Sequence, residues 1–453
     1  MALACAHNAC AAVTRCGQVF AWGSNFYGEI AQPECALETY DAVRVPLPDA
    51  PARMLAAGLW HQVAVLEDGR ACAWGRNEHG QLGSEASTDL GGAGVTLGWD
   101  LFGGESVLMA ACGNKHTLFV CRRGSVYACG QNSSGQLGLG DVLPRTGVTC
   151  IDASSFGGAR VAFAACGSCF CAVLTHDAGV FTWGAGVGGC LGHGDETPRA
   201  KPCAMQPHAF GGACILHLAA GDEHTVATDA AGDMLSWGDN SAGQLGLGHF
   251  APALVPTALR RHCLGGHGAR AVACGGDHTL FVSTRGELYV CGGSWNSSLG
   301  GLHNKHMASP SAVALRSFGG ENVAAVAATY GHSAVLTRGG KIFSWGRGLL
   351  TQEQTRLHMR TDVGAWDWWV HPLVRRVSQQ ALGGEPAGRY LPLPQALVLA
   401  VLMSQHARLG SLSPLRVLGV EVLREHVLCA GVSAHTRGLS AMLTLGLECA
   451  LAE

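Results

Sequence analysis

Residues 232–248 read GDMLSWGDNSAGQLGLG, and this stretch decides the fold because closely similar text recurs along most of the chain. Self-similarity at a fixed period is the sequence signature of a repeat architecture, so it takes precedence over any local motif. The related segments are 69–83, 124–140 and 179–194, with more divergent ones at 17–28, 286–300 and 340–348.

Three independent anchors share a period close to 54 residues, which predicts seven repeats. The first is the glycine that follows a Trp or Cys, at Gly23, Gly75, Gly130, Gly184, Gly238, Gly292 and Gly346. The second is a Phe-Gly-Gly step, which starts at Phe102, Phe156, Phe210 and Phe318 and is replaced by Leu-Gly-Gly at Leu264. The third is the histidine of a G-x-x-H step, interpreted as His7, His61, His116, His224, His278 and His332, with Phe170 in that slot in one copy.

Each repeat is predicted to consist of short β-strands. Apolar runs of four to six residues, such as 126–129 and 225–228, are bounded by Gly, Asn or Asp, which favours strands over helices. Four short strands in a unit of about 50 residues, stacked radially, form a propeller blade. We therefore predict an all-β, seven-bladed propeller.

The two ends of the repeat region are both incomplete. Residues 1–16 resemble the second half of a repeat, whereas the seventh copy, starting at Gly340, stops near residue 385 without its G-x-x-H strand pair. This pattern predicts a ring that is closed by N- and C-terminal halves pairing in one blade, which leaves no open end.

Composition limits the classes of partner and compartment. Charged residues make up only 14% of the chain and the net charge is −3, so we expect no sequence-specific nucleic-acid partner. The chain has 20 cysteines, but Cys112 and Cys166 share a repeat slot with Ala57, so they are predicted to be buried apolar groups in a reducing compartment. Without a secretory signal or a membrane-length apolar run, an intracellular location, cytoplasmic or nuclear, and no membrane partner are expected.

The recurring text G-x-(V/L)-(F/Y)-x-(W/C)-G…G-Q-L-G-x-G and A-x-G-x-x-H-(T/S) resembles the regulator of chromosome condensation repeat. The resemblance covers about residues 1–385 and implies a seven-bladed β-propeller. Members of that family include guanine-nucleotide exchange factors for the small GTPase Ran, ubiquitin-ligase subunits, a plant ultraviolet-B receptor and many scaffolds. The resemblance therefore implies the fold and leaves several functions open.

Two family features are absent from this sequence. The Ran exchange factor carries a β-wedge insertion in one blade and a basic tail, whereas copies three to six here keep a strict 54-residue step and no basic run follows. Only the irregular loops at 84–100 and 349–371 are candidates for such a wedge. The ultraviolet receptor places tryptophans beside its repeat histidines as G-W-R-H, and here only residues 58–61, Gly-Leu-Trp-His, come near that pattern.

No local motif predicts catalysis. A ring of catalytic histidines has no chemical rationale, so a structural hydrogen-bonding role is preferred for the repeat histidines. The Gly-Gln-Leu-Gly loops lack the Lys-Ser/Thr and helix of a phosphate-binding loop, so they are interpreted as turns. Metal binding was weighed for Cys166-x-x-Cys169, for the loop at 262–267 and for His303 with His306, and in each case a structural or loop role is preferred. We predict no catalytic, cofactor or metal site, and no enzyme.

The candidate functional residues lie where the repeat breaks. Trp366, Trp368 and Trp369 are clustered within four residues, which is typical of either a core cap or a partner-binding hot spot. The segment 386–453 is predicted to be a helical C-terminal extension of unknown family, beyond the propeller at 1–385. The preferred function is a non-enzymatic protein-protein interaction module. The alternatives are an exchange factor for a small GTPase and the substrate-recognition part of a ubiquitin-ligase complex.

Overall fold

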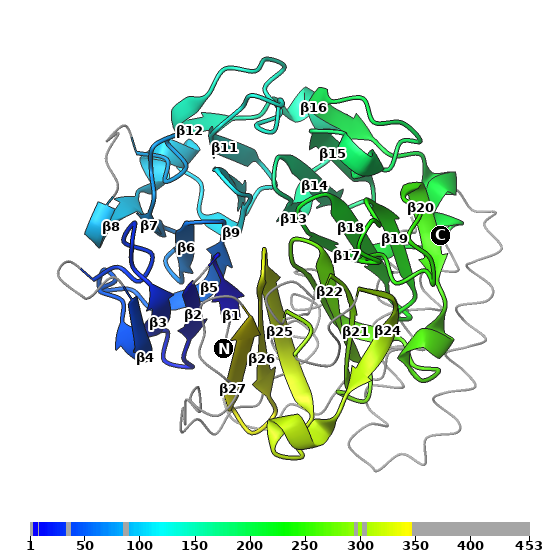
Figure 1. The fold of residues 1–453 in the computed structure, drawn as a ribbon. Coiled ribbons are helices and arrows are strands. Elements are labelled where there is room, and N and C mark those ends of the chain that lie inside the picture. The colour runs from blue at the N-terminus through cyan, green and yellow to red at the C-terminus, as the bar shows by residue number, and fades with distance from the viewer. Residues whose placement is uncertain are drawn as a thin grey trace, which may run out of the picture. The chain divides into compact units, whose positions relative to one another are not determined.

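Seven antiparallel sheets stand side by side around a common centre in the computed structural model (Figure 1). The structure describes residues 3–7, 9–32, 38–84, 90–293, 298–300 and 306–346. Each sheet is one blade of a propeller, and the blades are numbered 1 to 7 in chain order. The predicted all-β, seven-bladed propeller is confirmed.

The strands fall into four layers from the centre outward. The innermost strands are β1 (Leu3–Cys5), β5 (Ala52–Ala57), β9 (Val107–Cys112), β13 (Val161–Cys166), β17 (Ile215–Ala220), β21 (Ala269–Cys274) and β25 (Val323–Thr329). The second strands are β2 (Ala9–Val13), β6 (His61–Leu66), β10 (His116–Cys121), β14 (Phe170–Thr175), β18 (His224–Asp229), β22 (His278–Ser283) and β26 (His332–Thr337).

The third strands are β3 (Val19–Ser24), β7 (Ala71–Gly75), β11 (Val126–Gly130), β15 (Val180–Gly184), β19 (Met234–Gly238), β23 (Leu288–Gly292) and β27 (Ile342–Gly346). The fourth strands are β4 (Glu38–Arg44), β8 (Leu90–Leu97), β12 (Arg145–Cys150), β16 (Arg199–Ala204), β20 (Ala253–Leu259) and β24 (Met307–Val313). Short 3-10 turns are η1 (Trp99–Phe102), η2 (Ala153–Phe156), η3 (Val187–Gly189), η4 (Pro207–Phe210), η5 (Arg261–Leu264) and η7 (Leu315–Phe318). Within the described residues, no helix is long and apolar enough to cross a membrane.

The hydrophobic core is divided into clusters that lie between neighbouring blades. One cluster joins Leu118 and Ala128 of blade 3 to Val173 and Trp183 of blade 4, and equivalent clusters fill the other interfaces. The second strand of most blades is buried along its whole length because it is covered on both sides. This double burial explains why these strands read as continuous apolar runs rather than as alternating patterns.

The ring closes by packing of one blade against another, which differs from the prediction. In the described part of the chain, blade 1 has the order β1-β2-β3-β4 and consists of residues 3–44, so the pair β1-β2 belongs with β3 and β4 rather than with β27 of the seventh copy. Instead, Cys10 and Trp22 of blade 1 pack against Ala334 and Leu336 of blade 7. The recurring text begins at the third strand of a blade, whereas the blade itself begins at its innermost strand. A fixed period gives the distance between equivalent positions in successive blades, but it does not show at which strand a blade begins.

The anchor glycines are explained by the backbone. The glycine that ends each third strand has a positive φ, for example 100° at Gly75 and 110° at Gly238. A side chain at Gly238 would also overlap the carbonyl oxygen of Glu223 in the adjoining loop. Only glycine meets both conditions without strain, so this position is constant in all seven repeats.

Part of the irregular stretch at 84–100 belongs to the sheet. Residues 90–97 form β8, which pairs with β7 in the register Ala71↔Leu97 and Ala73↔Val95. The stretch is a candidate substitute for a β-wedge, but residues 90–97 within it are the ordinary outer strand of blade 2. The other candidate, 349–371, lies outside the described residues, as do Trp366, Trp368, Trp369 and the predicted extension at 386–453.

Candidate protein-interaction face

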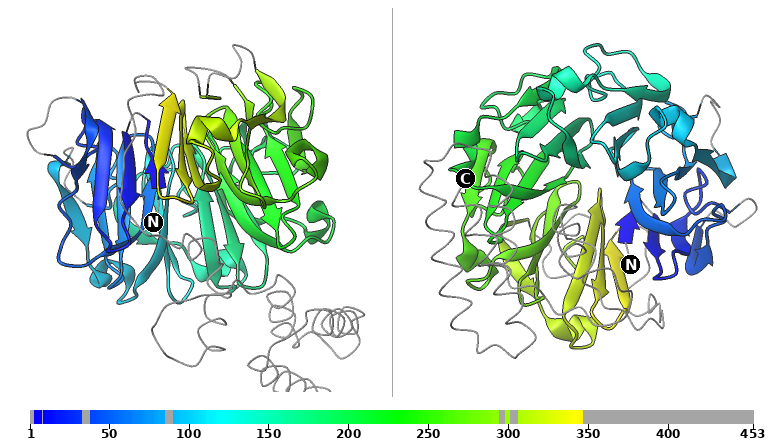
Figure 2. Two further views of the ribbon diagram at one scale, coloured as in Figure 1. Left: turned by 90° about the horizontal axis from the view of Figure 1, so that it is seen from below. Right: turned by 180° about the vertical axis from the view of Figure 1, so that it is seen from behind.

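Two sets of loops, in which the repeats differ most, lie at one end of the propeller. Because successive strands are antiparallel, the loops from the first to the second strand and from the third to the fourth strand emerge at the same end, here called the loop face. The strands run between this end and the opposite one when the ring is seen from the side (Figure 2). Backbone hydrogen bonds tie the two loops of a blade together, as from Arg76 N to Trp60 O (2.9 Å) and from Asp239 N to Glu223 O (2.9 Å).

The inner loops are also linked from blade to blade around the axis. Asn114 N donates to Ser168 O (3.1 Å), and Ser168 N donates to Asp222 O (3.1 Å). His7 N makes the corresponding bond to Leu59 O (2.8 Å), across the boundary between blades 1 and 2. The loops of this face are therefore joined by backbone hydrogen bonds, while their side chains differ from blade to blade.

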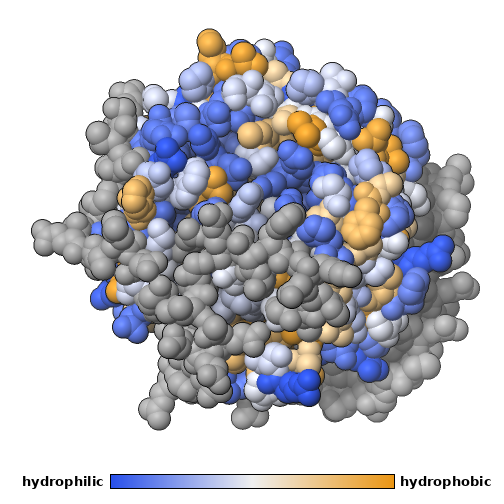
Figure 3. Space-filling view, in the orientation of Figure 1, coloured by the Kyte–Doolittle hydropathy of each residue, from blue (hydrophilic) through white to orange (hydrophobic). Residues whose placement is uncertain are grey.

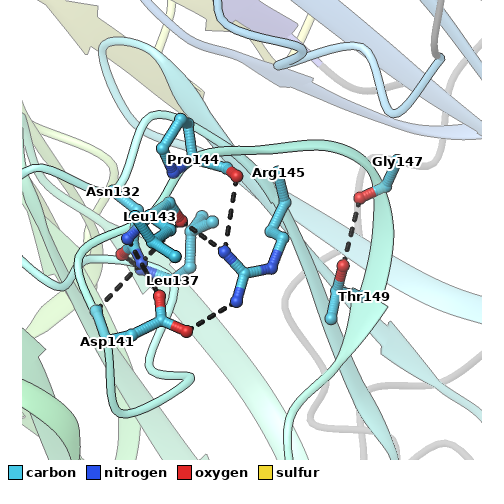
Figure 4. Close-up of polar contacts among 8 residues, drawn as sticks. All are labelled: Asn132, Leu137, Asp141, Leu143, Pro144, Arg145, Gly147 and Thr149. Carbon is cyan, nitrogen blue, oxygen red and sulfur yellow. Dashed lines mark hydrogen bonds and ion pairs between the residues drawn. The ribbon is translucent and has the colours of Figure 1, made fainter.

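The outer loops are made rigid by buried side-chain hydrogen bonds. In blade 3 the Asn132 amide nitrogen donates to the carbonyl oxygens of Asp141 and Leu143 (both 3.0 Å), while its amide oxygen accepts from Leu137 N (2.9 Å) (Figure 4). Arg145 completes the loop through an ion pair with Asp141 (2.6 Å). Asn240 makes the equivalent bonds in blade 5, which explains why the asparagine before Gly-Gln-Leu-Gly recurs.

An aromatic and cationic cluster occupies blades 1, 2 and 7 of the loop face. The Arg76 guanidinium carbon lies 4.4 Å from the centre of the Tyr27 ring and 4.7 Å from that of Trp60. The His7 ring lies 5.9 Å from the Trp60 ring and 5.5 Å from the Tyr330 ring. The Tyr27 and Trp60 rings also contact each other, with centres 5.8 Å apart, so the guanidinium lies over both rings. Each contact of this kind contributes about 0.5–1 kcal/mol at a partly exposed site. We call these five residues, together with Phe26, the aromatic sector.

The aromatic sector offers surface to a partner. Phe26 is 64% exposed and Tyr330 is 45% exposed. Arg76 is also paired with Glu78, whose second oxygen lies 3.5 Å from the Lys115 ammonium. The sector thus combines apolar rings with cations on loops that are already fixed, which are the residue types that dominate binding energy in protein interfaces.

A cluster of carboxylates occupies blades 5 and 6 of the same face and is called the acidic sector: Asp222, Glu223, Asp239 and Asp277. Burial, together with repulsion from Asp277 and Glu223, raises the pKa of Asp222 to about 7. Burial and the neighbouring Asp239 carboxylate also raise the pKa values of Glu223 and Asp277. Like charges held this close favour the neutral form, so a cation from outside would stabilise the ionised cluster.

Exposed apolar side chains are concentrated on the loop face. Beyond Phe26 and Tyr330, the outer loops present Val142, Leu143 and Phe250, which are 55%, 62% and 50% exposed. A space-filling view shows how hydrophobic side chains are scattered among hydrophilic ones over one side of the propeller (Figure 3). Single exposed apolar residues are ordinary, but their concentration on one rigid face marks a candidate interaction surface.

The repeat histidines are buried between blades and do not belong to this surface. His61 Nε2 lies 2.9 Å from Thr117 Oγ1 of the next blade, and that hydroxyl donates to Gln81 O (2.7 Å). Because the hydroxyl proton is already used, the histidine is the donor in the first bond. His224 and His278 make the equivalent bonds. Burial lowers the pKa of His61 to about 3, so this ring is neutral. We propose a structural role for these residues as links between blades.

His7 was assigned to the wrong slot. The histidine slot pairs with the anchor glycine of the third strand, as His61 pairs with Gly75. In blade 1 the residue that pairs with Gly23 is Ala9, so Ala9 occupies the slot and His7 lies two residues earlier, on the loop face. A constant step of 14 residues from slot to glycine, as from His61 to Gly75, is the signal in the sequence that identifies the correct position.

The glycine of the G-x-x-H step makes room for the histidine ring. A side-chain carbon added at Gly221 would overlap the ring of His224 and the carbonyl oxygen of Gly275 in the next blade. Blade 1 supports this explanation, because Ala6 stands in the glycine position where Ala9 replaces the histidine. Blade 7 differs, because Thr329 stands at the glycine position three residues before His332. Packing against the ring therefore explains the glycine in the other histidine-bearing blades, and no catalytic role is needed.

The fold does not group Cys166 with Cys169, the Cys-x-x-Cys pair for which the sequence favours a structural role over metal binding. In the part of the chain that the structure describes, the group of three potential metal-ligating side chains is His116, Cys166 and Cys171. Cys263 and His306 do not belong to it, and His303 lies outside the described residues. All 17 cysteines of the described residues are free thiols. Cys129 and Cys291 are buried at the position before the anchor glycine, which Trp74 and Trp237 occupy in other blades; we call this position the tryptophan slot.

Comparisons with known proteins match this geometry. The family model described as "Regulator of chromosome condensation (RCC1) repeat" matches residues 177–228 and 231–282, and a second model of the same description matches 110–136, 215–244, 269–298 and 323–350. The chain is 34% identical over 312 residues to the ultraviolet-B receptor UVR8 of Arabidopsis thaliana, covering 68% of each protein. The chain belongs to the regulator of chromosome condensation repeat family.

Two further similarities concern the repeat region or the fold rather than a whole relative's function. The chain is 30% identical to the probable E3 ubiquitin-protein ligase HERC6 of Homo sapiens, over 56% of its own length but only 24% of that protein. The crystal structure of Prp20p from Saccharomyces cerevisiae, a protein with described binding properties to Gsp1p and histones, matches with a TM-score of 0.62 and 21% identity, covering 78% of this chain and 83% of that one. This structural likeness concerns the fold.

Proposed function

We propose that this RCC1-repeat propeller is a non-enzymatic module that binds a protein partner through its loop face. The observation that carries the proposal is the asymmetry of that face, with the aromatic sector on blades 1, 2 and 7 and the acidic sector on blades 5 and 6. A partner that places anionic or apolar groups against Arg76 and basic groups against Asp222 matches this arrangement. Complementary charge at two separated points fixes the orientation of a partner as well as its affinity.

The test compares capture of partners by the full-length chain and by variants of each sector. Trp60→Ala with Arg76→Ala removes the aromatic sector, and Glu223→Gln with Asp277→Asn neutralises part of the acidic sector. We expect each pair to weaken capture by about tenfold or more, because aromatic and arginine anchors commonly contribute 2 kcal/mol or more.

The matched control lies at the opposite end of the propeller. Arg122 and Arg123 are exposed in the hairpin between β10 and β11, and their replacement by Gln alters charge without touching the loop face. Capture should be unchanged in this variant. A partner that is retained by both loop-face variants and lost with the hairpin variant would overturn the proposal.

Guanine-nucleotide exchange is the second candidate. It is favoured by the likeness to Prp20p, for which binding properties to Gsp1p are described, although the 21% identity concerns the fold. Release of labelled GDP from a panel of small GTPases, Ran included, tests it with the purified full-length chain. Acceleration that is abolished by the acidic-sector variant would make exchange the function of the loop face, and an unchanged rate across the panel would leave partner binding alone.

A ubiquitin-ligase role is a third candidate, which follows from the similarity to HERC6. In that case the propeller would recognise a substrate, and residues 386–453 would contact the rest of the complex. Capture with and without this segment distinguishes the two parts, since substrate binding should survive its removal and complex assembly should not. Light sensing is not proposed. The ultraviolet receptor has tryptophans beside several repeat histidines, whereas in this chain Trp60 alone stands directly beside one, so the similarity to UVR8 is one of overall sequence.

A further inference from the structure

The boundary between blades 3 and 4 brings three metal-ligating side chains together. His116 starts β10, while Cys166 and Cys171 face each other across the pairing of β13 with β14. His116 Nε2 lies 3.1 Å from Cys171 Sγ, and Cys171 Sγ lies 3.6 Å from Cys166 Sγ. All three ligand atoms lie within 4.8 Å of one another, and His116 and Cys171 are fully buried.

The repeats themselves provide the comparison for this site. In blades 3, 5 and 6 the slot of Cys171 holds Thr117, Thr225 or Thr279, and the slot of Cys166 holds alanine in blades 2, 5 and 7. A histidine linked to a threonine hydroxyl is thus the ordinary arrangement between blades. Both slots also hold thiols in blade 1, where Cys5 pairs with Cys10. Among the described residues, the group whose three ligand atoms lie within 4.8 Å of one another is His116, Cys166 and Cys171, in which two soft sulfur ligands and one imidazole nitrogen replace the usual hydrogen-bonding pair.

We propose that His116, Cys166 and Cys171 bind one Zn²⁺ ion between blades 3 and 4. Zinc bonds of about 2.3 Å to sulfur and about 2.0–2.1 Å to nitrogen place tetrahedral ligands roughly 3.5–3.8 Å apart. The observed separations of 3.1 and 3.6 Å are close to that spacing. Thiolate and imidazole ligands are also the set that zinc prefers over magnesium or calcium.

Charge balance favours a divalent ion. Binding releases one proton from each thiol to solvent, so two thiolates, a neutral imidazole and Zn²⁺ form a neutral unit, which is the condition for burial.

A fourth donor is at hand in the backbone. The Gln136 carbonyl oxygen accepts from Cys171 Sγ (3.3 Å) and from Trp183 Nε1 (2.9 Å). When Cys171 loses its proton, the carbonyl keeps the tryptophan as a hydrogen-bond partner and has a lone pair free for the metal. Structural zinc sites almost always have four ligands, so this oxygen completes the set.

The experiment measures zinc bound to the full-length protein. The protein is purified under reducing conditions from zinc-supplemented medium, and its metal content is determined by elemental mass spectrometry. The variants Cys171→Thr and Cys166→Ala introduce residues that other blades already carry in the same slots, so both should fold. We expect about one zinc per chain in the wild type and less than about a tenth of that in each variant.

Two controls separate this site from other thiols. Cys274→Ala changes the slot equivalent to Cys166 in blade 6, where Thr279 stands opposite, and should keep the full zinc content. Cys10→Thr changes the pair Cys5–Cys10, which occupies the equivalent slots in blade 1 with its sulfurs 2.8 Å apart. Because these thiols are not part of the group of three ligands found among the described residues, this variant should also keep the full zinc content.

A spectroscopic signature tests the ligands independently. Replacement of zinc by Co²⁺ should produce a thiolate-to-metal charge-transfer absorption in the wild type that is absent from Cys171→Thr. The proposal is overturned by a metal-free wild type, by copper in place of zinc, by a Cys166–Cys171 disulfide under the same reducing conditions, or by zinc that Cys171→Thr retains.

Discussion

Replacing Asp222 with asparagine is expected to change how the stability of the propeller depends on pH. Asp222 lies in the acidic sector, where burial and its neighbours Asp277 and Glu223 raise its pKa from 3.8 to about 7. An asparagine has similar shape and no titrating proton. The difference in free energy of unfolding between wild type and variant therefore isolates the cost of placing a charge at this position.

The sign follows from the protons bound in each state. Below pH 4 the carboxyl is protonated in both the folded and the unfolded chain, so it contributes no pH dependence. Between pH 4 and 7 the unfolded chain releases the proton while the folded chain keeps it, so stability falls as pH rises, and above pH 7 the penalty is constant. A shift from 3.8 to about 7 corresponds to roughly 4 kcal/mol in full. Because the side chain is partly exposed, we expect about 1–2 kcal/mol.

The assay is urea unfolding of both proteins at pH 4.5, 6 and 8. Asp222→Asn should match the wild type most closely at pH 4.5 and be the more stable protein at pH 8. Asp233→Asn is the control, because hydrogen bonds from Arg261 lower the pKa of Asp233, so this carboxyl is ionised in the folded and unfolded chain throughout this pH range. This variant should be less stable than the wild type by nearly the same amount at all three pH values. An Asp222→Asn variant whose difference from the wild type is the same at all three pH values would refute the reasoning about the acidic sector.

Three further predictions concern the loops and the blade contacts. Gly221→Ala should lower the free energy of unfolding by about 2–4 kcal/mol through overlap with the His224 ring. Adding His224→Ala should restore part of this loss in thermal unfolding, and a double variant no more stable than the single one would contradict this. His224→Phe introduces the residue found at Phe170, and since burial lowers the pKa of His224 to about 4, the wild type but not the variant should lose stability through this position as pH falls from 6.5 to 4. Arg76→Lys keeps the charge but not the planar stack on Trp60, so partner affinity measured by calorimetry should fall about threefold to tenfold, and unchanged affinity would exclude a role for the stack.

The sequence predicted the architecture because its strongest signals are local backbone requirements. Gly75 and its equivalents need a positive φ at a fixed point of every blade, so their spacing measures the blade directly. Gly221 also meets a local requirement, because the ring of His224 occupies the space that a side chain at this position would need. Burial of the tryptophan-slot residues also followed from the pattern, since Trp237 and Cys291 are both inaccessible to solvent.

Other features depend on contacts between repeats, which a period does not encode. The strand at which a blade starts is set by hydrogen bonding, so the phase of the ring and the slot of His7 were predicted incorrectly. The aromatic sector joins an outer loop of blade 1, through Tyr27, to both loops of blade 2, through Trp60 and Arg76. Trp60 and Arg76 directly flank the constant His61 and Gly75, and these flanking positions vary between repeats. Only a comparison of the flanking positions could have identified the aromatic sector from the sequence.

The most direct test of partner binding through the loop face is site-specific photo-crosslinking. A photoreactive amino acid is placed at position 60 or 223 on the loop face, or at position 123 in the hairpin at the opposite end, and each full-length protein is irradiated with its captured partner. Adducts with the same partner should form from positions 60 and 223 and should be absent from position 123. Adducts that form from position 123 while both loop-face positions give none would contradict the central claim.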